Sequence, residues 1–142
     1  MDLNSRFRRV GCFFVILFLM MAVSATAHHS FAMYDHSRTV TLKGAVTRFQ
    51  WTNPHAYIEL DVTDPKGTVT HYSVECTSIN MMQRNGWRSN MIKAGDMVKA
   101  VIAPLNSGQP GGLLLEVTLP NGKTLEPGVP AANTFKRTPE QD

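Results

Sequence analysis

The sequence predicts an all-β domain with one short helix: an OB-like, five-stranded Greek-key barrel with the chain order β-β-β-α-β-β. Three observations predict it. Segments of alternating apolar and polar residues recur along the chain, Gly and Pro turns separate them, and one segment of helical period falls between the third and fourth strands. A small open sandwich is the alternative, because a sequence pattern does not show that a sheet closes.

The first strand is predicted over residues 38–51, and its apolar phase changes just past Gly44. Such a change indicates a bulge or a sharp bend, and the first strand of an OB barrel commonly bends to serve both sides of the barrel. Residues 55–62 alternate cleanly, which predicts a half-buried second strand. The turn residues Asp64 to Gly67 then lead into the third strand.

The apolar positions also predict how the second and third strands pair. Opposing Ile58 to Val74 places the apolar side chains of both strands on one face. The other face then carries three polar pairs: Tyr57 with Glu75, Glu59 with Ser73, and Asp61 with His71.

The segment after the third strand has the signals of a short helix. Ser78 is a good N-cap, Gly86 suits the position after the helix, and Ile79 with Met82 forms an apolar i,i+3 pair. We expect Trp87 to cover the end of the barrel. Two further strands follow, in "MVKAVIA" and "LLLEVTL", and the dipeptide Asn121-Gly122 closes a small hairpin.

The first 27 residues have the layout of a secretory signal peptide. Three arginines precede an apolar run of about a dozen residues, and the small residues Ala25-Thr26-Ala27 follow it. The run is well short of the roughly 20 residues that a membrane-spanning helix needs, so we expect cleavage and no stable membrane anchor. The sequence thus divides into a signal peptide (1–27), an N-terminal arm (28–37), the barrel (38–125) and a disordered, proline-containing tail (126–142).

Removal of the leader changes what the composition implies. Residues 1–27 hold three arginines and one aspartate, so the formal net charge falls from +3 to about +1. This balance gives no support to a nucleic-acid partner.

Of the two cysteines only Cys76 remains, which excludes an intramolecular disulfide, and we expect a buried, inert thiol. The predicted location is periplasmic or secreted.

Three stretches resemble an exported bacterial family catalogued only as a domain of unknown function, DUF6152. They are "HHSFAMYD", "VTLKGAVTRFQWTNPHAYIELDV", and "NGWRSNMIKAGDMV" with the later "GGLLLEV". The resemblance covers nearly all of the mature chain and implies an exported small β-domain of the OB type. It implies no activity and no catalytic residues.

The histidines around the expected cleavage site predict a copper ligand set. Cleavage after Ala27 makes His28 the first residue, whose α-amine and ring nitrogen chelate one ion, as in the histidine brace of certain copper proteins. Cleavage after Ala25 instead leaves Thr26-Ala27-His28, a square-planar site for Cu(II) or Ni(II). The candidate additional ligands are His29, His36 and His55. The plainer interpretation is an ordinary polar terminus that binds copper only incidentally.

A second candidate site lies where the second strand begins. His55 follows Asn53-Pro54 and is flanked by Trp51 and Tyr57, on the face that OB folds commonly use for ligands. The alternative is a turn-and-cap role in which Asn53 bonds to the backbone and His55 is half exposed.

The sequence therefore predicts an exported small β-barrel binding protein and not an enzyme. The first hypothesis is copper binding through His28, with copper as the one candidate cofactor. The alternative is a module that docks an envelope protein or a small ligand on the face formed by Trp51, Asn53, His55 and Tyr57. A copper-dependent oxidative activity needs an open substrate surface, for which so small a domain offers little room.

Overall fold

The structure is a computed structural model, and it describes residues 31–129 and 132–138. The predicted leader and the histidines at positions 28 and 29 lie outside these residues. The chain divides into two compact units, residues 1–32 and 33–142, and all of the described strands lie in the second unit. Among the described residues, none forms a helix long and apolar enough to cross a bilayer.

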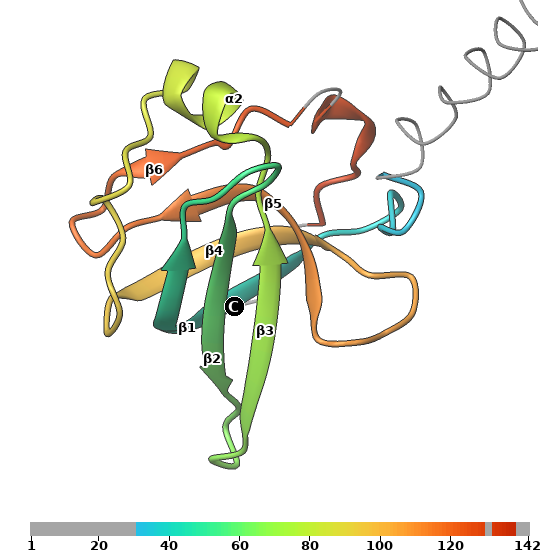
Figure 1. Cartoon of the computed structure of the whole chain (residues 1–142). Coiled ribbons are helices and arrows are strands. Elements are labelled where there is room, and N and C mark those ends of the chain that lie inside the picture. The colour runs from blue at the N-terminus through green and yellow to red at the C-terminus, as the bar shows by residue number, and fades with distance from the viewer. Residues whose placement is uncertain (1–30, 130–131, 139–142) are drawn as a thin grey trace, which may run out of the picture. The chain divides into compact units, whose positions relative to one another are not determined.

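Five strands close into a barrel, which confirms the predicted OB-like architecture (Figure 1). The sheet order is β3-β2-β1-β4-β5, and a parallel pairing of β3 with β5 closes it, while the short β6 extends the sheet beside β5. The only α-helix described, α2, lies between β3 and β4, as predicted. The bounds are β1 Val40–Gln50, β2 Tyr57–Thr63, β3 Val69–Glu75, α2 Ile79–Arg84, β4 Met97–Pro104, β5 Gly111–Thr118 and β6 Thr124–Leu125.

Strand β1 serves both sides of the barrel. Its first half pairs with β4, from Val40 opposite Ile102 onward, and its second half pairs with β2. The β1–β2 register shifts between Val46 and Arg48, where the extra residue of a bulge bends the strand. The phase change just past Gly44 is therefore explained by this bulge.

The predicted register of β2 and β3 is confirmed. Ile58 lies opposite Val74, and the three polar pairs form as expected. Ile58, Leu60 and Val74 are fully buried because their face lines the barrel interior. The pairing continues past the strands, since the Cys76 N–H donates to the Ala56 carbonyl at 2.8 Å.

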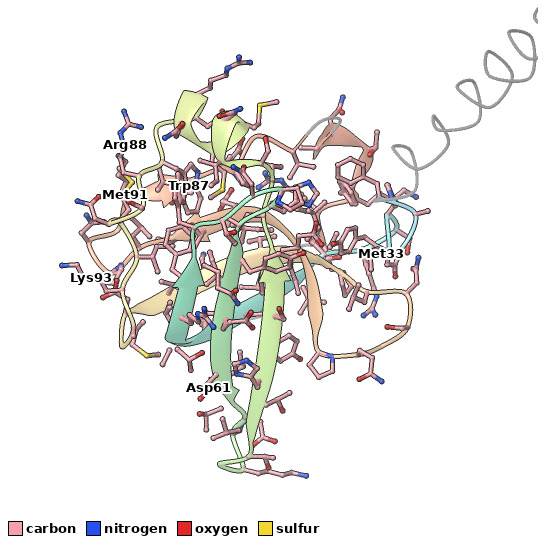
Figure 2. The ribbon with its side chains drawn as sticks, in the orientation of Figure 1. Met33, Asp61, Trp87, Arg88, Met91 and Lys93 are labelled. Carbon is pink, nitrogen blue, oxygen red and sulfur yellow. The ribbon has the colours of Figure 1, made fainter. Side chains whose placement is uncertain are left out.

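The helix closes one end of the barrel. The Ser78 side chain accepts the Met81 N–H, and Gly86 leaves the helix with φ +86°, a conformation that favours glycine. Trp87 follows directly and is fully buried, and its ring lies between α2 and the strands (Figure 2). The predicted cover of the barrel end is thus present.

The tail differs from the predicted disordered segment. Over residues 126–129 and 132–138 it packs against the barrel, with Pro127 and Phe135 buried and a 3-10 turn at Ala132–Thr134. The physical reason is that two buried donors need acceptors. The Glu126 carbonyl accepts Trp87 Nε1 at 2.8 Å, and the Pro127 carbonyl accepts the Thr77 hydroxyl at 2.6 Å.

Two consecutive glycines let β5 approach both of its neighbours. Gly111 lies opposite Ser73 and Gly112 opposite Val74 on β3, while Gly112 also pairs with Pro104 on β4. A Cβ on Gly112 would lie 2.4 Å from the Ala103 carbonyl oxygen, and one on Gly111 would lie 2.8 Å from that of Ser73. Any side chain here must push the backbones apart.

We expect Gly112→Ala to destabilise the fold strongly. The nearest atom to the added methyl is the Ala103 carbonyl oxygen, which cannot move aside as the end of a side chain can. We therefore expect a loss of roughly 3 kcal/mol of unfolding free energy, the upper end for overpacking, measured by urea denaturation. Gly122→Ala is the matched control. Its φ is +82° with open space around it, so the loss there should be about 1 kcal/mol. Equal losses of unfolding free energy for the two variants would show that the close approach of β5 to its neighbouring strands is not what makes Gly112 necessary.

Candidate functional site

A half-buried polar cluster forms where the β1–β2 connection meets the end of β3. His55 stands directly before Ala56 and β2, after an Asn53–Pro54 peptide bond that is cis. Its Nδ1 bonds Oε1 of Glu75, the last residue of β3. The side chains of His55 and Glu75 are 35% and 18% exposed, so the pair lies at the surface with its carboxylate mostly covered.

The N-terminal arm brings a third side chain to the same carboxylate. The Tyr34 hydroxyl donates to Oε2 of Glu75 at 2.6 Å, and Tyr34 itself is only 3% exposed. Burial, followed by this hydrogen bond, raises the pKa of the Tyr34 phenol far above its usual value. Tyr34 therefore stays a neutral donor at every physiological pH.

Tyr57 lies opposite Glu75 in the β2–β3 pairing and belongs to the same cluster. Burial raises the pKa of the Tyr57 phenol first, and the negative charge of Glu75 raises it further. Glu75 thus faces two phenols and one imidazole, which we call the Glu75 cluster: Tyr34, His55, Tyr57 and Glu75.

The arrangement fixes which nitrogen of His55 is available. An ionised carboxylate only accepts hydrogen bonds, so Nδ1 carries the proton shared with Glu75. In the neutral ring Nε2 then holds a lone pair, and within the part of the chain that the structure describes it has no hydrogen-bond partner. A histidine held in this way resembles those that ligate metals through one nitrogen while a carboxylate orients the other.

The predicted face assembles only in part. Two of its four residues, His55 and Tyr57, belong to the Glu75 cluster. Trp51 instead packs edge-on against Phe49, with ring centroids 5.5 Å apart, and is partly buried against the core. Asn53 is exposed in the connection, and its carbonyl accepts the Thr52 hydroxyl at 3.2 Å.

The structure does not bring the candidate copper ligands together within the residues that it describes. His28 and His29 lie outside them. His36 stacks on Phe135 at 4.3 Å between ring centroids, whereas His55 pairs with Glu75. No group of three or more His, Cys, Asp or Glu side chains that could hold a metal ion occurs within residues 31–129 and 132–138. The copper hypothesis therefore remains a prediction.

His71 forms the other histidine–carboxylate contact of the sheet, toward the free end of the β2–β3 hairpin where Figure 2 labels Asp61. Its Nδ1 lies 2.7 Å from Asp61 and its Nε2 3.3 Å from Glu59. The hydrogen bond with Asp61 is the main cause that raises the pKa of His71. Because both ring nitrogens of His71 face carboxylates, this contact has no free ligand atom.

The raised pKa of His71 predicts a small pH dependence of stability. The charged form is favoured in the folded state, so the stabilisation is fully present below the unfolded pKa near 6.5 and is lost as the pH rises through the higher folded value. At this exposure we expect roughly a few tenths of a kcal/mol. An NMR titration should give a pKa above 6.5, and Asp61→Asn should lower it.

Cys76 is buried at 1% exposure, as predicted. Burial raises the pKa of its thiol strongly, and the neighbouring charge of Glu75 adds to the effect. Since the thiolate is the reactive form, the folded protein should hold its thiol unreactive.

We expect Cys76 to react with a disulfide reagent such as DTNB only as fast as the protein opens. In denaturant the reaction should be complete within the mixing time, while in native buffer it should be slower by several orders of magnitude. A fast native reaction would show that the thiol is accessible.

Tyr34 and Glu75 were missed as site residues in the sequence. Glu75 was correctly placed beside Tyr57, but the pair gave no reason to prefer it over the other polar pairs of the outer face. Tyr34 lies 41 positions from Glu75, and no local pattern connects them. The one usable signal was a tyrosine next to an acid in the quoted string "HHSFAMYD".

Comparisons with known proteins identify the family and leave its role open. Residues 17–116 match a family described as "Family of unknown function (DUF6152)". The chain belongs to this family. The resemblance seen in the sequence is thus confirmed for the DUF6152 family itself, and no curated protein matches the chain.

One solved structure is similar to part of this chain. It is the crystal structure of Rim1, the mitochondrial single-stranded DNA-binding protein of S. cerevisiae, with a TM-score of 0.46 and 11% identity. The match covers 60% of this chain and 94% of Rim1. At this identity the ligand of Rim1 says nothing about the ligand of a DUF6152 protein, and the barrel assignment here rests on the strand pairings.

Proposed function

We propose that this DUF6152 protein is an exported, periplasmic or secreted, binding protein without catalytic activity, and that His55 is at the centre of its ligand site. The observation that carries the proposal is the Nδ1 contact of His55 with Glu75, which leaves Nε2 as an oriented lone-pair donor at the surface. The signal-peptide layout of residues 1–27 supports export.

The ligand we propose is a copper ion. Neutral imidazole suits copper, and a carboxylate on the second ring nitrogen raises the basicity of the first. One imidazole does not complete a copper site, and residues 31–129 and 132–138 hold no group of three or more His, Cys, Asp or Glu side chains that could bind a metal ion. His28 and His29 are the candidates that the sequence offers, with the α-amine freed by cleavage after Ala27.

We expect the exported, processed protein to bind Cu(II) in a 1:1 ratio. His28→Ala and His55→Ala should each lower the affinity at least about tenfold, or about 1.4 kcal/mol, in a titration against a competing chelator. His71→Ala is the matched control, because His71 also bonds a carboxylate of the sheet but has no free ring nitrogen. Mass spectrometry of the same sample gives the cleavage site.

A partner-docking module is the second candidate. The partly buried Trp51, two residues before the exposed Asn53, favours it, because Trp is enriched among the anchor residues of interfaces. Under this alternative the processed protein rejects stoichiometric copper, and Trp51→Ala weakens partner binding while His28→Ala leaves it unchanged. Normal copper binding by both histidine variants would overturn the copper proposal.

A further inference from the structure

Strand β3 is paired along its whole length on one side and only in part on the other. Every residue from Val69 to Glu75 lies opposite a residue of β2. The parallel pairing with β5 covers only the last three, Ser73 to Glu75. Figure 1 shows that the β2–β3 hairpin projects past the other strands. Among the described strands, β3 therefore has an open sheet edge from Val69 to Tyr72.

The backbone groups at this edge follow from the register. Residues of an antiparallel pair turn their N–H and C=O groups alternately toward the partner strand and away from it. The Ser73 N–H turns away from β2, because it donates to the Pro110 carbonyl at 3.5 Å. By alternation, Val69 and His71 also turn away from β2. Within residues 31–129 and 132–138, no strand pairs with them on that side.

Pro110 explains why β5 does not continue the pairing. Because Ser73 lies opposite Gly111, residue 110 is the one whose N–H would reach the His71 carbonyl in a longer parallel ladder. Proline has no N–H, so this bond cannot form. Two residues earlier the chain turns at Gly108, whose φ is +76°. The sequence before β5 thus keeps the edge of β3 open.

A hollow of about 180 Å³ lies where β3 and β5 separate. Tyr72 of β3 and Pro110 before β5 both line it. The rest of its apolar lining comes from Val40, Ile102, Pro104 and Leu105. A dry apolar cavity of about 150 Å³ in a protein core holds a benzene molecule, so this hollow has room for one large apolar side chain.

Arg38 supplies a positive charge at the same hollow. Its Nε bonds Oδ2 of Asp35 at 3.0 Å, and its side chain is 58% exposed. Asp35 in turn accepts the N–H and the hydroxyl of Ser37, so the guanidinium is oriented. The two Nη groups have no hydrogen-bond or ion-pair partner in the part of the chain that the structure describes. Two such donors match the two oxygens of a carboxylate.

We propose that the open edge of β3 binds an extended, acidic segment of another protein by strand addition. One large apolar side chain of the segment enters the hollow, and a carboxylate on the same face meets Arg38. In this mode of recognition, main-chain bonds supply affinity and the pockets for alternate side chains supply specificity. The main-chain bonds here are those to Val69 and His71. The proposal does not depend on copper binding at His55.

A second copy of this chain matches the edge less well. Edge-to-edge pairing would bring in another β3, and its side chains on the face of the hollow, Thr70 and Tyr72, offer no carboxylate to Arg38. It would also bring together the His71 groups of the two copies with their carboxylate neighbours. Charged side chains on an edge strand oppose pairing of this kind.

The test uses the mature full chain and a phage-displayed library of random heptapeptides as the probe. We expect enriched sequences with a large apolar residue and an acidic residue two positions apart, since these share one face of a strand. Synthetic peptides of these sequences should lose at least about tenfold in affinity when the backbone nitrogens that face β3 are methylated. Methylation of the alternate nitrogens is the control. A library that yields no binding peptide would overturn the proposal.

Hydrogen exchange shows where the peptide lies. Peptide binding should slow exchange at the Val69 and His71 amides at least about tenfold and leave Thr70 and Tyr72 nearly unchanged, because these two already face β2. A peptide that binds without protecting Val69 and His71 has its site elsewhere, for example at Trp51, and would overturn the proposal. So would protection of both amides before peptide is added. Protection that rises with protein concentration would identify a second copy as the occupant.

Two substitutions test the charge and the edge separately. Arg38→Gln should weaken the peptides at least about tenfold, whereas Arg84→Gln, which removes the same charge from α2, should not. Val69→Pro removes an edge N–H and should weaken binding, whereas Val69→Thr keeps that N–H and should not. Circular dichroism checks that Val69→Pro is folded. Affinities that are unchanged in Arg38→Gln and in folded Val69→Pro would overturn the proposal.

Discussion

The close approach of β5 to β3 and β4 is the constraint on which the rest of the structure depends. Gly111 and Gly112 permit it, because a side chain at either position would collide with a backbone carbonyl. With the barrel closed, Leu113 of β5 pairs with Glu75, and the end of β3 is fixed between β2 and β5. The carboxylate at the centre of the site is therefore positioned by the closure of the sheet.

A single carboxylate then organises the polar part of the surface. Removing most of the water from a carboxylate is costly unless hydrogen-bond donors replace it, and donors to an ionised group make the stronger bonds. Tyr34 and His55 supply such donors from two segments that share no strand pairing. The hydrogen bonds of the cluster therefore join the arm to the barrel. They also orient the His55 imidazole, which an apolar contact would not do.

Most of the barrel could be predicted from the sequence, because its signals are local. Alternation fixed the β2–β3 register, and Ser78 and Gly86 marked the ends of α2. The candidate site was harder to predict from the sequence, because Tyr34, which bonds Glu75, lies in an arm whose sequence carries no strand pattern. The prediction of disorder was wrong for the described part of the tail, residues 126–129 and 132–138, for a related reason. Disorder was predicted from its composition, which has prolines and few apolar residues. Its order instead depends on backbone carbonyls that accept hydrogen bonds from the buried donors of Trp87 and Thr77.

The contact between the arm and the tail has a consequence for chain connectivity. Residues 36–39 and 136–138 run side by side, so the segment before β1 lies next to the segment after the 3-10 turn. Domains with adjacent ends commonly tolerate circular permutation. A chain joined there and reopened at the exposed Asp64–Gly67 turn would keep every strand pairing. Such a permuted chain would separate the packing of the arm from its place before β1 in the chain.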